Sequence, residues 1–124
     1  MQKIEHIGIA VKDIEESNLL FAKLLNSQHY KMEEVESEGV ITSFFKVGDV
    51  KIELLQATNE KSAIHKFIDK KGEGVHHIAF TVEDVNQELK RLKDEGFDAI
   101  HKKAKDGADG KVIAFIHPKS TNKV

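Results

Sequence analysis

The segment His6-Ile-Gly-Ile-Ala-Val-Lys-Asp-Ile14 recurs 71 residues later as His77-Ile-Ala-Phe-Thr-Val-Glu-Asp-Val85. Each copy opens with a histidine and continues as an alternating apolar run, which is typical of a β-strand. An aspartate then precedes a second apolar pattern, and a Glu or Gln three residues later completes a capping box for a helix start. The repeat therefore predicts two modules, which turn from strand to helix at Asp13 and at Asp84.

The remaining elements follow from the same kinds of pattern. Residues 40–47 and 50–55 are predicted strands, joined by a tight turn at Gly48-Asp49. Ser62 is a predicted cap for a short connecting helix, and residues 112–116 form a predicted strand of the second module. The first helix is expected to bury a stripe that consists of Leu20, Phe21, Leu24 and Leu25.

The domain organisation follows from length and repeat. The 124 residues suit one α+β domain, with module one at about residues 1–60, a connector at about 61–73 and module two at about 74–124. The counterpart of the hairpin's last strand would come after Val124, so we expect module two to lack its last strand.

The composition excludes several classes of function. Hydrophobic residues make up 40% and charged residues 32%, which indicates a folded globular protein. No cysteine is present, so a metal site would have to use nitrogen and oxygen ligands. A net charge of -2 with dispersed lysines argues against nucleic acid. Since we find neither a long apolar run nor a targeting segment, we expect a cytoplasmic protein without membrane contact.

The two repeated histidines share their strand faces with small residues. Alternation places His6 and His77 on faces whose other members are Gly8, Ala10, Ala79 and Thr81. The opposite faces are apolar and are expected to face the core, with Ile7, Ile9, Val11, Ile78, Phe80 and Val82. A face of small residues beside a histidine leaves room for a ligand. The adjacent His76 is expected on the core side.

A carboxylate joins the two histidines as a candidate ligand. In the predicted hairpin, Glu53 alternates with apolar residues and is directed toward the same kind of surface. A single histidine or glutamate in a strand is more often a hydrogen-bonded structural residue than a ligand. The recurrence of His6 and His77 at matching positions, together with Glu53, favours a metal site over that structural interpretation.

Three segments resemble a known family. They are Lys51-Ile-Glu-Leu-Leu55, Gly72-Glu-Gly-Val-His-His-Ile-Ala-Phe80 and His117-Pro-Lys-Ser120, and they resemble the vicinal oxygen chelate (glyoxalase/bleomycin resistance) superfamily. Within it, the segments are most similar to methylmalonyl-CoA epimerases. The resemblance implies two βαβββ modules that form a partly open, barrel-like sheet around a metal cleft. It also implies one divalent ion, for which Co, Ni, Zn and Mn are the candidates.

The same resemblance implies roles for individual residues. His6, Glu53 and His77 match the family's metal ligands. The family's fourth ligand, a glutamate after the His-Pro-Lys-Ser turn, would lie beyond Val124, so the catalytic residue stays unassigned. Some epimerases carry a carboxylate where this chain has Thr42, and no base is assigned there. Lys119 and Ser120 are expected to contact a phosphate or carboxylate of the substrate.

The implied activity is an isomerisation. Epimerases of this kind interconvert methylmalonyl-CoA epimers by 1,1-proton transfer through a metal-stabilised enolate, so the expected partner is an acyl-CoA thioester. A homodimer is expected by resemblance. Two alternatives remain open: a glyoxalase I (lactoylglutathione lyase) of the same fold, and a non-catalytic small-molecule-binding protein with no metal requirement.

Overall fold

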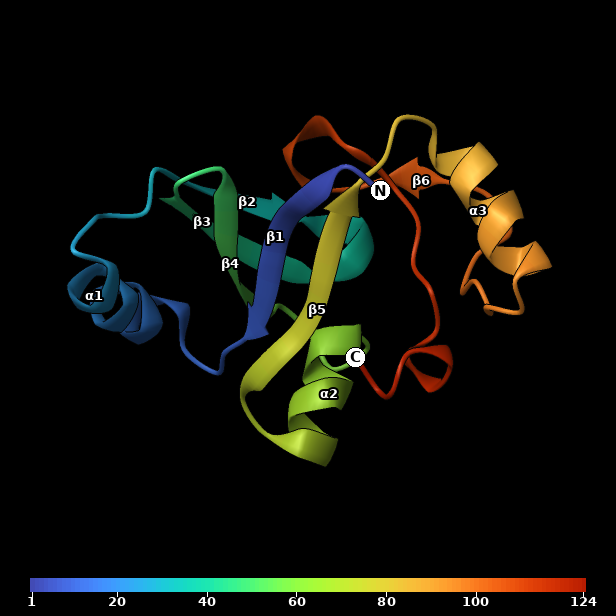
Figure 1. The fold of residues 1–124 in the computed structure, drawn as a ribbon. Helices are drawn as coiled ribbons and strands as arrows, with labels where there is room; N and C mark the ends of the chain where they lie inside the picture. The colour runs from blue at the N-terminus through green and yellow to red at the C-terminus, as the bar shows by residue number, and fades with distance from the viewer. The chain divides into compact units, whose positions relative to one another are not determined.

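The computed structural model describes residues 1–124, which form a mixed α+β fold (Figure 1). The chain divides into two compact units. One unit consists of residues 4–79, and the other of residues 1–3 with 80–124. The first carries a five-stranded sheet, and the second a two-stranded one, so the predicted α+β class with an open sheet is confirmed.

The five-stranded sheet has the order β2-β3-β4-β1-β5. Its strands are β1 (Lys3–Ala10), β2 (Lys31–Val35), β3 (Val40–Val47), β4 (Val50–Ala57) and β5 (Gly74–Thr81). β3 and β4 form the predicted hairpin, with Val47 opposite Val50 and Gly48 at a φ of 60°. A residue with a side chain rarely adopts that φ, which explains a glycine at the turn. β1 pairs with β4 in parallel, and β5 runs beside β1 in the opposite direction (Figure 1).

The helices of this unit begin at the predicted caps. α1 (Ile14–Leu25) starts after Asp13, whose carboxylate accepts a hydrogen bond from the Glu16 amide. α2 (Ala63–Lys71) starts after Ser62, whose hydroxyl accepts from the Ile64 amide. A third, 3-10 helix covers Glu36–Glu38. No helix anywhere in the structure is long and apolar enough to cross a membrane.

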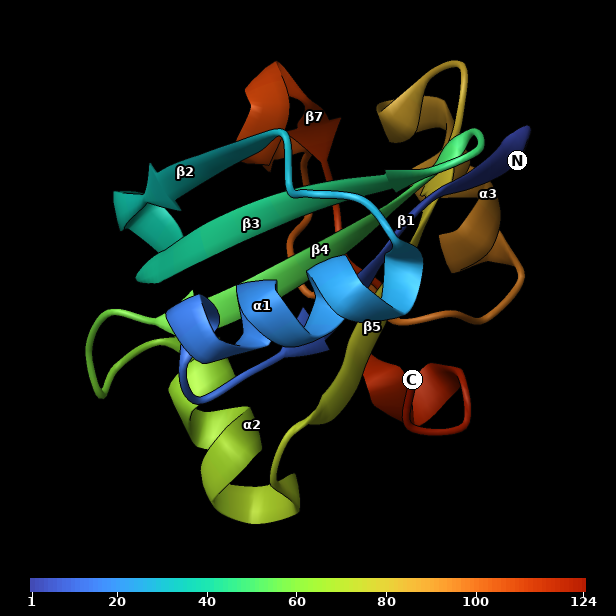
Figure 2. The ribbon, with the colours of Figure 1, turned by 90° about the vertical axis from the view of Figure 1, so that its left-hand side faces the viewer.

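Helices cover the two faces of the sheet separately. α1 lies on one face, where Ile14 packs with Val11, Phe45 and Leu54 (Figure 2). On the other face Ile64 of α2 packs with Ala10, Val40 and Leu55. Because neighbouring residues of β4 alternate between these two cores, Glu53 shares the face of Leu55, as predicted. That face also carries His6 and Gly8 of β1.

The predicted apolar stripe of α1 is half wrong. Leu20 and Leu24 are 63% and 70% exposed, whereas the side that contacts the sheet consists of Ile14, Asn18, Phe21, Ala22 and Leu25. Asn18 is buried because its Oδ1 accepts a hydrogen bond of 2.5 Å from the buried Ser43 hydroxyl. A polar residue in the middle of the buried side shifts the apparent hydrophobic stripe toward the exposed leucines.

The second unit holds α3 (Val85–Asp94), β6 (Lys105–Asp106), β7 (Val112–Ile113) and the 3-10 helices Ala108–Gly110 and Pro118–Ser120. Asp84 caps α3 as predicted, and Leu89 and Leu92 are buried. The strand predicted over residues 112–116 is shorter than expected. Only its first two residues pair with β6, while Ile116 forms an isolated bridge with Ala99, so the segment changes partner part-way.

One predicted core row is also exposed. Ile78 and Phe80 of β5 were expected to face a core, but they are 39% and 48% exposed. β5 is an edge strand of the five-stranded sheet, and neither hydrophobic core cluster includes a residue from it. Alternation therefore gives the face of a residue correctly without telling whether that face is covered.

We expect substitutions in the core and on the exposed side of α1 to differ sharply in their effect on the free energy of unfolding. Leu54→Ala removes a fully buried side chain and should lower the free energy of unfolding by about 2–5 kcal/mol. Leu24→Ala, the matched control on the exposed side of α1, should change it by less than about 0.5 kcal/mol. Chemical denaturation of both variants measures this; a comparable loss in Leu24→Ala would show that the helix packs by its leucine side.

Candidate metal centre

The three predicted ligands come from three adjacent strands. His6 lies on β1, with β4 on one side and β5 on the other. Glu53 lies on β4 directly opposite Gly8, two residues beyond His6 on the same face. His77 lies on β5. Strand order and alternation therefore bring residues 6, 53 and 77 to one face of the sheet.

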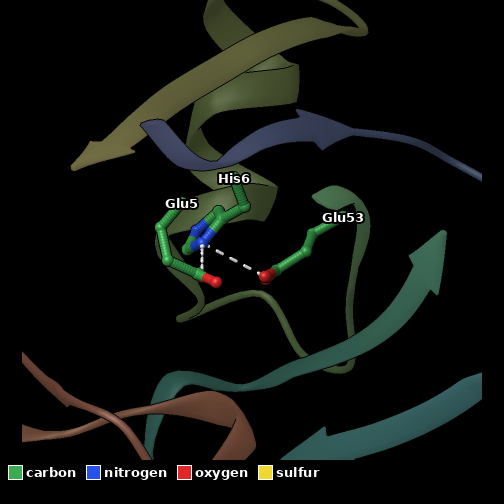
Figure 3. Close-up of side chains that lie close together, drawn as sticks. All are labelled: Glu5, His6 and Glu53. Atoms are coloured by element: carbon green, nitrogen blue, oxygen red, sulfur yellow. Dashed lines mark hydrogen bonds and ion pairs between the residues drawn. The ribbon is translucent and has the colours of Figure 1, made fainter. Parts of the chain in front are cut away.

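The His6 ring stands between the two other predicted ligands, Glu53 and His77. Its Nδ1 lies 2.8 Å from Oε1 of Glu5 and 3.2 Å from Oε2 of Glu53 (Figure 3). Its Nε2 lies 2.9 Å from Nε2 of His77, and the two rings meet edge to face with centroids 5.0 Å apart. The predicted residues are thus together, but Glu53 and His77 approach opposite nitrogens of His6.

Glu5 is a member of the cluster that the sequence reasoning missed. Strict alternation would send its side chain to the opposite face from His6, yet its carboxylate reaches the ring of that neighbouring residue. Its second oxygen lies 3.0 Å from the ammonium of Lys51, the residue that pairs with His6 across β1 and β4. Glu5, His6 and Glu53 together present three ligand atoms that lie within 4.8 Å of one another.

His76 is a second residue that reasoning from alternation did not place here. Its Nδ1 lies 2.9 Å from Nδ1 of His77, although alternation assigns the two residues to opposite faces. The ring of Phe67 from α2 meets His76 edge to face at 5.0 Å and holds it in place. The sequence signal that could have found both residues is adjacency, since Glu5 and His76 each directly precede a candidate ligand.

A glycine makes room for the second histidine. A Cβ atom built on Gly8 would lie 2.7 Å from both ring nitrogens of His77. That separation is shorter than real Cβ contacts allow, so any side chain at this position would displace the ring. The small residues were expected to leave a hollow for a ligand. Part of the space beside Gly8 is instead occupied by the His77 ring itself.

The electrostatics of the cluster keep the imidazoles neutral. Burial, together with the neighbouring His6 and His76, lowers the pKa of His77 to about 3. Burial also lowers the pKa of His6, against the opposing effect of Glu5, and it lowers that of His76. Partial burial acts to raise the pKa of Glu5, but the hydrogen bonds with His6 and Lys51 outweigh it and the pKa lies below its usual value.

These residues fit a divalent cation by the chemistry of their donors. Neutral imidazole and carboxylate are the nitrogen and oxygen ligands of first-row metals, and ligands that are already deprotonated need not release a proton on binding. The Nε2 atoms of His6 and His77, which would hold such an ion, lie 2.9 Å apart.

The remaining residues that the resemblance singles out are Lys119, Ser120 and Thr42. Lys119 and Ser120 belong to the second unit, in the 3-10 helix Pro118–Ser120. The Lys119 ammonium lies 3.4 Å from a carboxylate oxygen of Asp98, and the Ser120 hydroxyl accepts from the Asp98 amide. Thr42 is 1% exposed, and its hydroxyl has no hydrogen-bond partner within the protein.

The sequence and the structure both resemble known proteins. The family profile for the Glyoxalase/Bleomycin resistance protein/Dioxygenase superfamily matches residues 5–115. The chain is 39% identical to the uncharacterized protein YqjC of Bacillus subtilis, over all of this chain and 89% of that one. It is 35% identical to the mitochondrial methylmalonyl-CoA epimerase of Dictyostelium discoideum, over 98% of this chain and 74% of that one.

The chain belongs to this superfamily. A solved structure supports the assignment: a variant of Streptomyces coelicolor methylmalonyl-CoA epimerase, in complex with 2-nitronate-propionyl-CoA, matches with a TM-score of 0.96. The identity is 32%, and the match covers 100% of this chain and 90% of that one. The superfamily and the similarity to epimerases that the sequence analysis expected are both confirmed.

Replacing Gly8 tests the role of that glycine. We expect Gly8→Ala to push the His77 ring away from His6, to lower the free energy of unfolding by about 1–3 kcal/mol and to weaken Zn²⁺ or Co²⁺ binding. The control Ile9→Val lies on the same strand but faces the other core, so it should leave cation binding unchanged. Calorimetric titration compares the two, and unchanged binding in Gly8→Ala would contradict the assigned role.

The low pKa of His77 predicts a pH dependence of stability. In the metal-free protein the folded state resists protonation of His77 until pH 3, whereas an unfolded chain takes up the proton near pH 6.5. The stabilisation is therefore complete above pH 6.5 and is lost progressively as the pH falls toward 3. The slope should reach up to about 1.4 kcal/mol per pH unit.

Chemical denaturation at several pH values in the presence of a chelator measures this slope. His77→Gln removes the titrating group and should flatten the dependence, whereas His6 and His76 continue to contribute in the same direction. A variant whose stability still falls as steeply as that of the unaltered protein would show that His77 does not cause the loss.

Proposed function

We propose that this protein is a metal-dependent isomerase of the methylmalonyl-CoA epimerase type, which moves a proton at the carbon between a thioester and a carboxylate of an acyl-CoA. The observation that carries the proposal is the pair of neutral, partly buried imidazoles of His6 and His77, with the buried carboxylate of Glu53 beside them. The similarity to methylmalonyl-CoA epimerases supports the choice of substrate class.

We propose that His6, Glu53 and His77 hold the cation. A divalent ion bound there supplies Lewis-acid polarisation of the substrate's carbonyl oxygens, which makes the adjacent carbon more acidic. The two imidazoles are neutral and Glu53 contributes one negative charge, so these ligands would leave a positive charge for an anionic substrate. The charge of Glu5 does not cancel it, because Glu5 is paired with the Lys51 ammonium.

A buried aromatic residue would help to exclude water from the reacting group. Phe44 of β3 stands opposite Glu53 and is completely buried, so it shields one side of that carboxylate from water. Such shielding strengthens electrostatic interactions within a site. We propose that Lys119 and Ser120 contact a phosphate or carboxylate of the acyl-CoA.

Solvent exchange at the reacting carbon gives a direct test of the activity. In D₂O, the protein loaded in turn with Co²⁺, Ni²⁺, Zn²⁺ and Mn²⁺ should catalyse the replacement of the hydrogen at carbon 2 of methylmalonyl-CoA by deuterium. Proton NMR measures this exchange as the loss of the signal of that hydrogen. Chelator-treated protein, His6→Ala and Glu53→Ala should each lose at least about 100-fold in rate, as expected for removal of a ligand to a catalytic ion. The exposed His101→Ala is the control and should retain the full rate.

The same protein preparations separate the other activities. Isomerisation of the glutathione hemithioacetal without deuterium exchange into the acyl-CoA would overturn the proposal in favour of a glyoxalase I. Acyl-CoA binding that His6→Ala leaves intact, with no exchange in any metal form, would instead indicate a binding protein.

A further inference from the structure

Four side chains at the candidate metal centre form one continuous line of short contacts. Glu5 touches His6, His6 touches His77, and His77 touches His76, with distances between the facing atoms of 2.8, 2.9 and 2.9 Å. Lys51 stands at the Glu5 end, 3.0 Å from the second carboxylate oxygen. Only two of these side chains, His6 and His77, are proposed ligands, so the line extends beyond the metal site on both sides.

Hydrogen-bond chemistry gives this line a direction. Ionised carboxylates only accept, so the His6 Nδ1 that faces Glu5 and Glu53 must carry the hydrogen. A neutral His6 then has a lone pair on Nε2. The contact between the two Nε2 atoms therefore needs a hydrogen on His77, and the contact between the two Nδ1 atoms needs one on His76. Every contact is satisfied when His76 donates to His77, His77 to His6, and His6 to Glu5.

A cation bound by Nε2 of both His6 and His77 requires a different position of the ring hydrogen on only one of the two histidines. His6 already presents a lone pair at Nε2, because Glu5 holds its hydrogen on the other nitrogen. His77 does not, since its Nε2 carries the hydrogen that is donated to His6. To bind a cation there, His77 must carry its hydrogen on Nδ1, which faces Nδ1 of His76.

We propose that Glu5 and His76 are positioning residues for the cation, with different tasks. Glu5 holds His6 in one tautomer, in which Nε2 always presents a lone pair. His76 reverses its hydrogen bond with His77 when a cation binds, so that it donates to His77 in the metal-free protein and accepts from His77 in the loaded one. The inference rests on the proposed metal site.

The change balances without a net gain or loss of protons. The hydrogen on His77 Nε2 leaves to water as the cation takes its place. The hydrogen on His76 Nδ1 passes to Nδ1 of His77, and Nε2 of His76 takes one from water. An imidazole suits this task because the same atom, Nδ1, can donate or accept. Phe67 keeps the His76 ring in position throughout, by its edge-to-face contact.

The tautomers can be observed directly, without any activity measurement. Long-range ¹H–¹⁵N correlation spectra of the full chain should show His6 with its hydrogen on Nδ1 both before and after Zn²⁺ is added. His77 should change from a hydrogen on Nε2 to a hydrogen on Nδ1, and its Nε2 resonance should shift on metal binding. A His6 that binds Zn²⁺ through Nδ1, or a His77 that keeps one tautomer, overturns the proposal.

Paired variants separate positioning from direct ligation. Glu5→Gln keeps a carbonyl oxygen that accepts from His6, and His76→Asn keeps both an acceptor and a donor near His77. Glu5→Ala and His76→Phe keep neither. Calorimetric titration with Zn²⁺ should show a loss of about 10–100-fold in affinity for the second pair and retention of most of it in the first. The half-buried His65 of α2, which pairs with Asp69, gives the control: His65→Ala should bind as the unaltered chain does.

The outcomes distinguish this inference from the proposed function. If Glu5→Gln weakens binding as much as Glu5→Ala does, Glu5 is a direct ligand and the positioning role is wrong, whatever the activity. If the unaltered chain binds no Zn²⁺, Co²⁺, Ni²⁺ or Mn²⁺, both the metal site and this inference are overturned. If binding and tautomers behave as expected but no deuterium exchange occurs, only the proposed activity is overturned.

Discussion

The 2.9 Å contact between the His6 and His77 rings is the constraint on which the rest of the site depends. Two protonated imidazoles could not stay at that separation in a partly buried site, so the contact requires at least one of the rings to be neutral. It also requires β1 and β5 to be neighbours, and it requires the absence of a side chain at Gly8. The repeated sequence meets these demands because it places a histidine at the same point of two strands that the fold brings side by side.

Much of this arrangement could be predicted from the sequence. Period-two alternation in the two copies gave the face of each histidine, and the caps at Asp13, Ser62 and Asp84 gave the helix starts. The hairpin that carries Glu53 could be predicted because a glycine at its turn separates two apolar strands. These signals are local. Each depends on residues within a few positions of one another, and hydrogen-bond and steric rules act over that same range.

What could not be predicted depends on contacts between distant segments. Leu24 is exposed and Asn18 is buried because the partner of Asn18 is Ser43, a residue of another strand. Glu5 joins the site because Lys51 of β4 lies beside His6 and binds the carboxylate. Alternation describes the direction in which a side chain leaves the backbone, whereas a long side chain at the start of a strand can still turn back toward its neighbour.

The position of Glu53 relative to His77 shows why the ligands and their supports have to be considered together. The two residues approach opposite nitrogens of His6, so a cation held by all three needs a different Glu53 side-chain conformation from the one seen here. Glu5 makes such a movement possible, because it already accepts the hydrogen of His6 Nδ1 at the shorter distance of 2.8 Å. Glu53 can then leave that nitrogen without exposing an unpaired donor. The residue that precedes the first histidine would thereby free the carboxylate of the hairpin to serve as the proposed ligand.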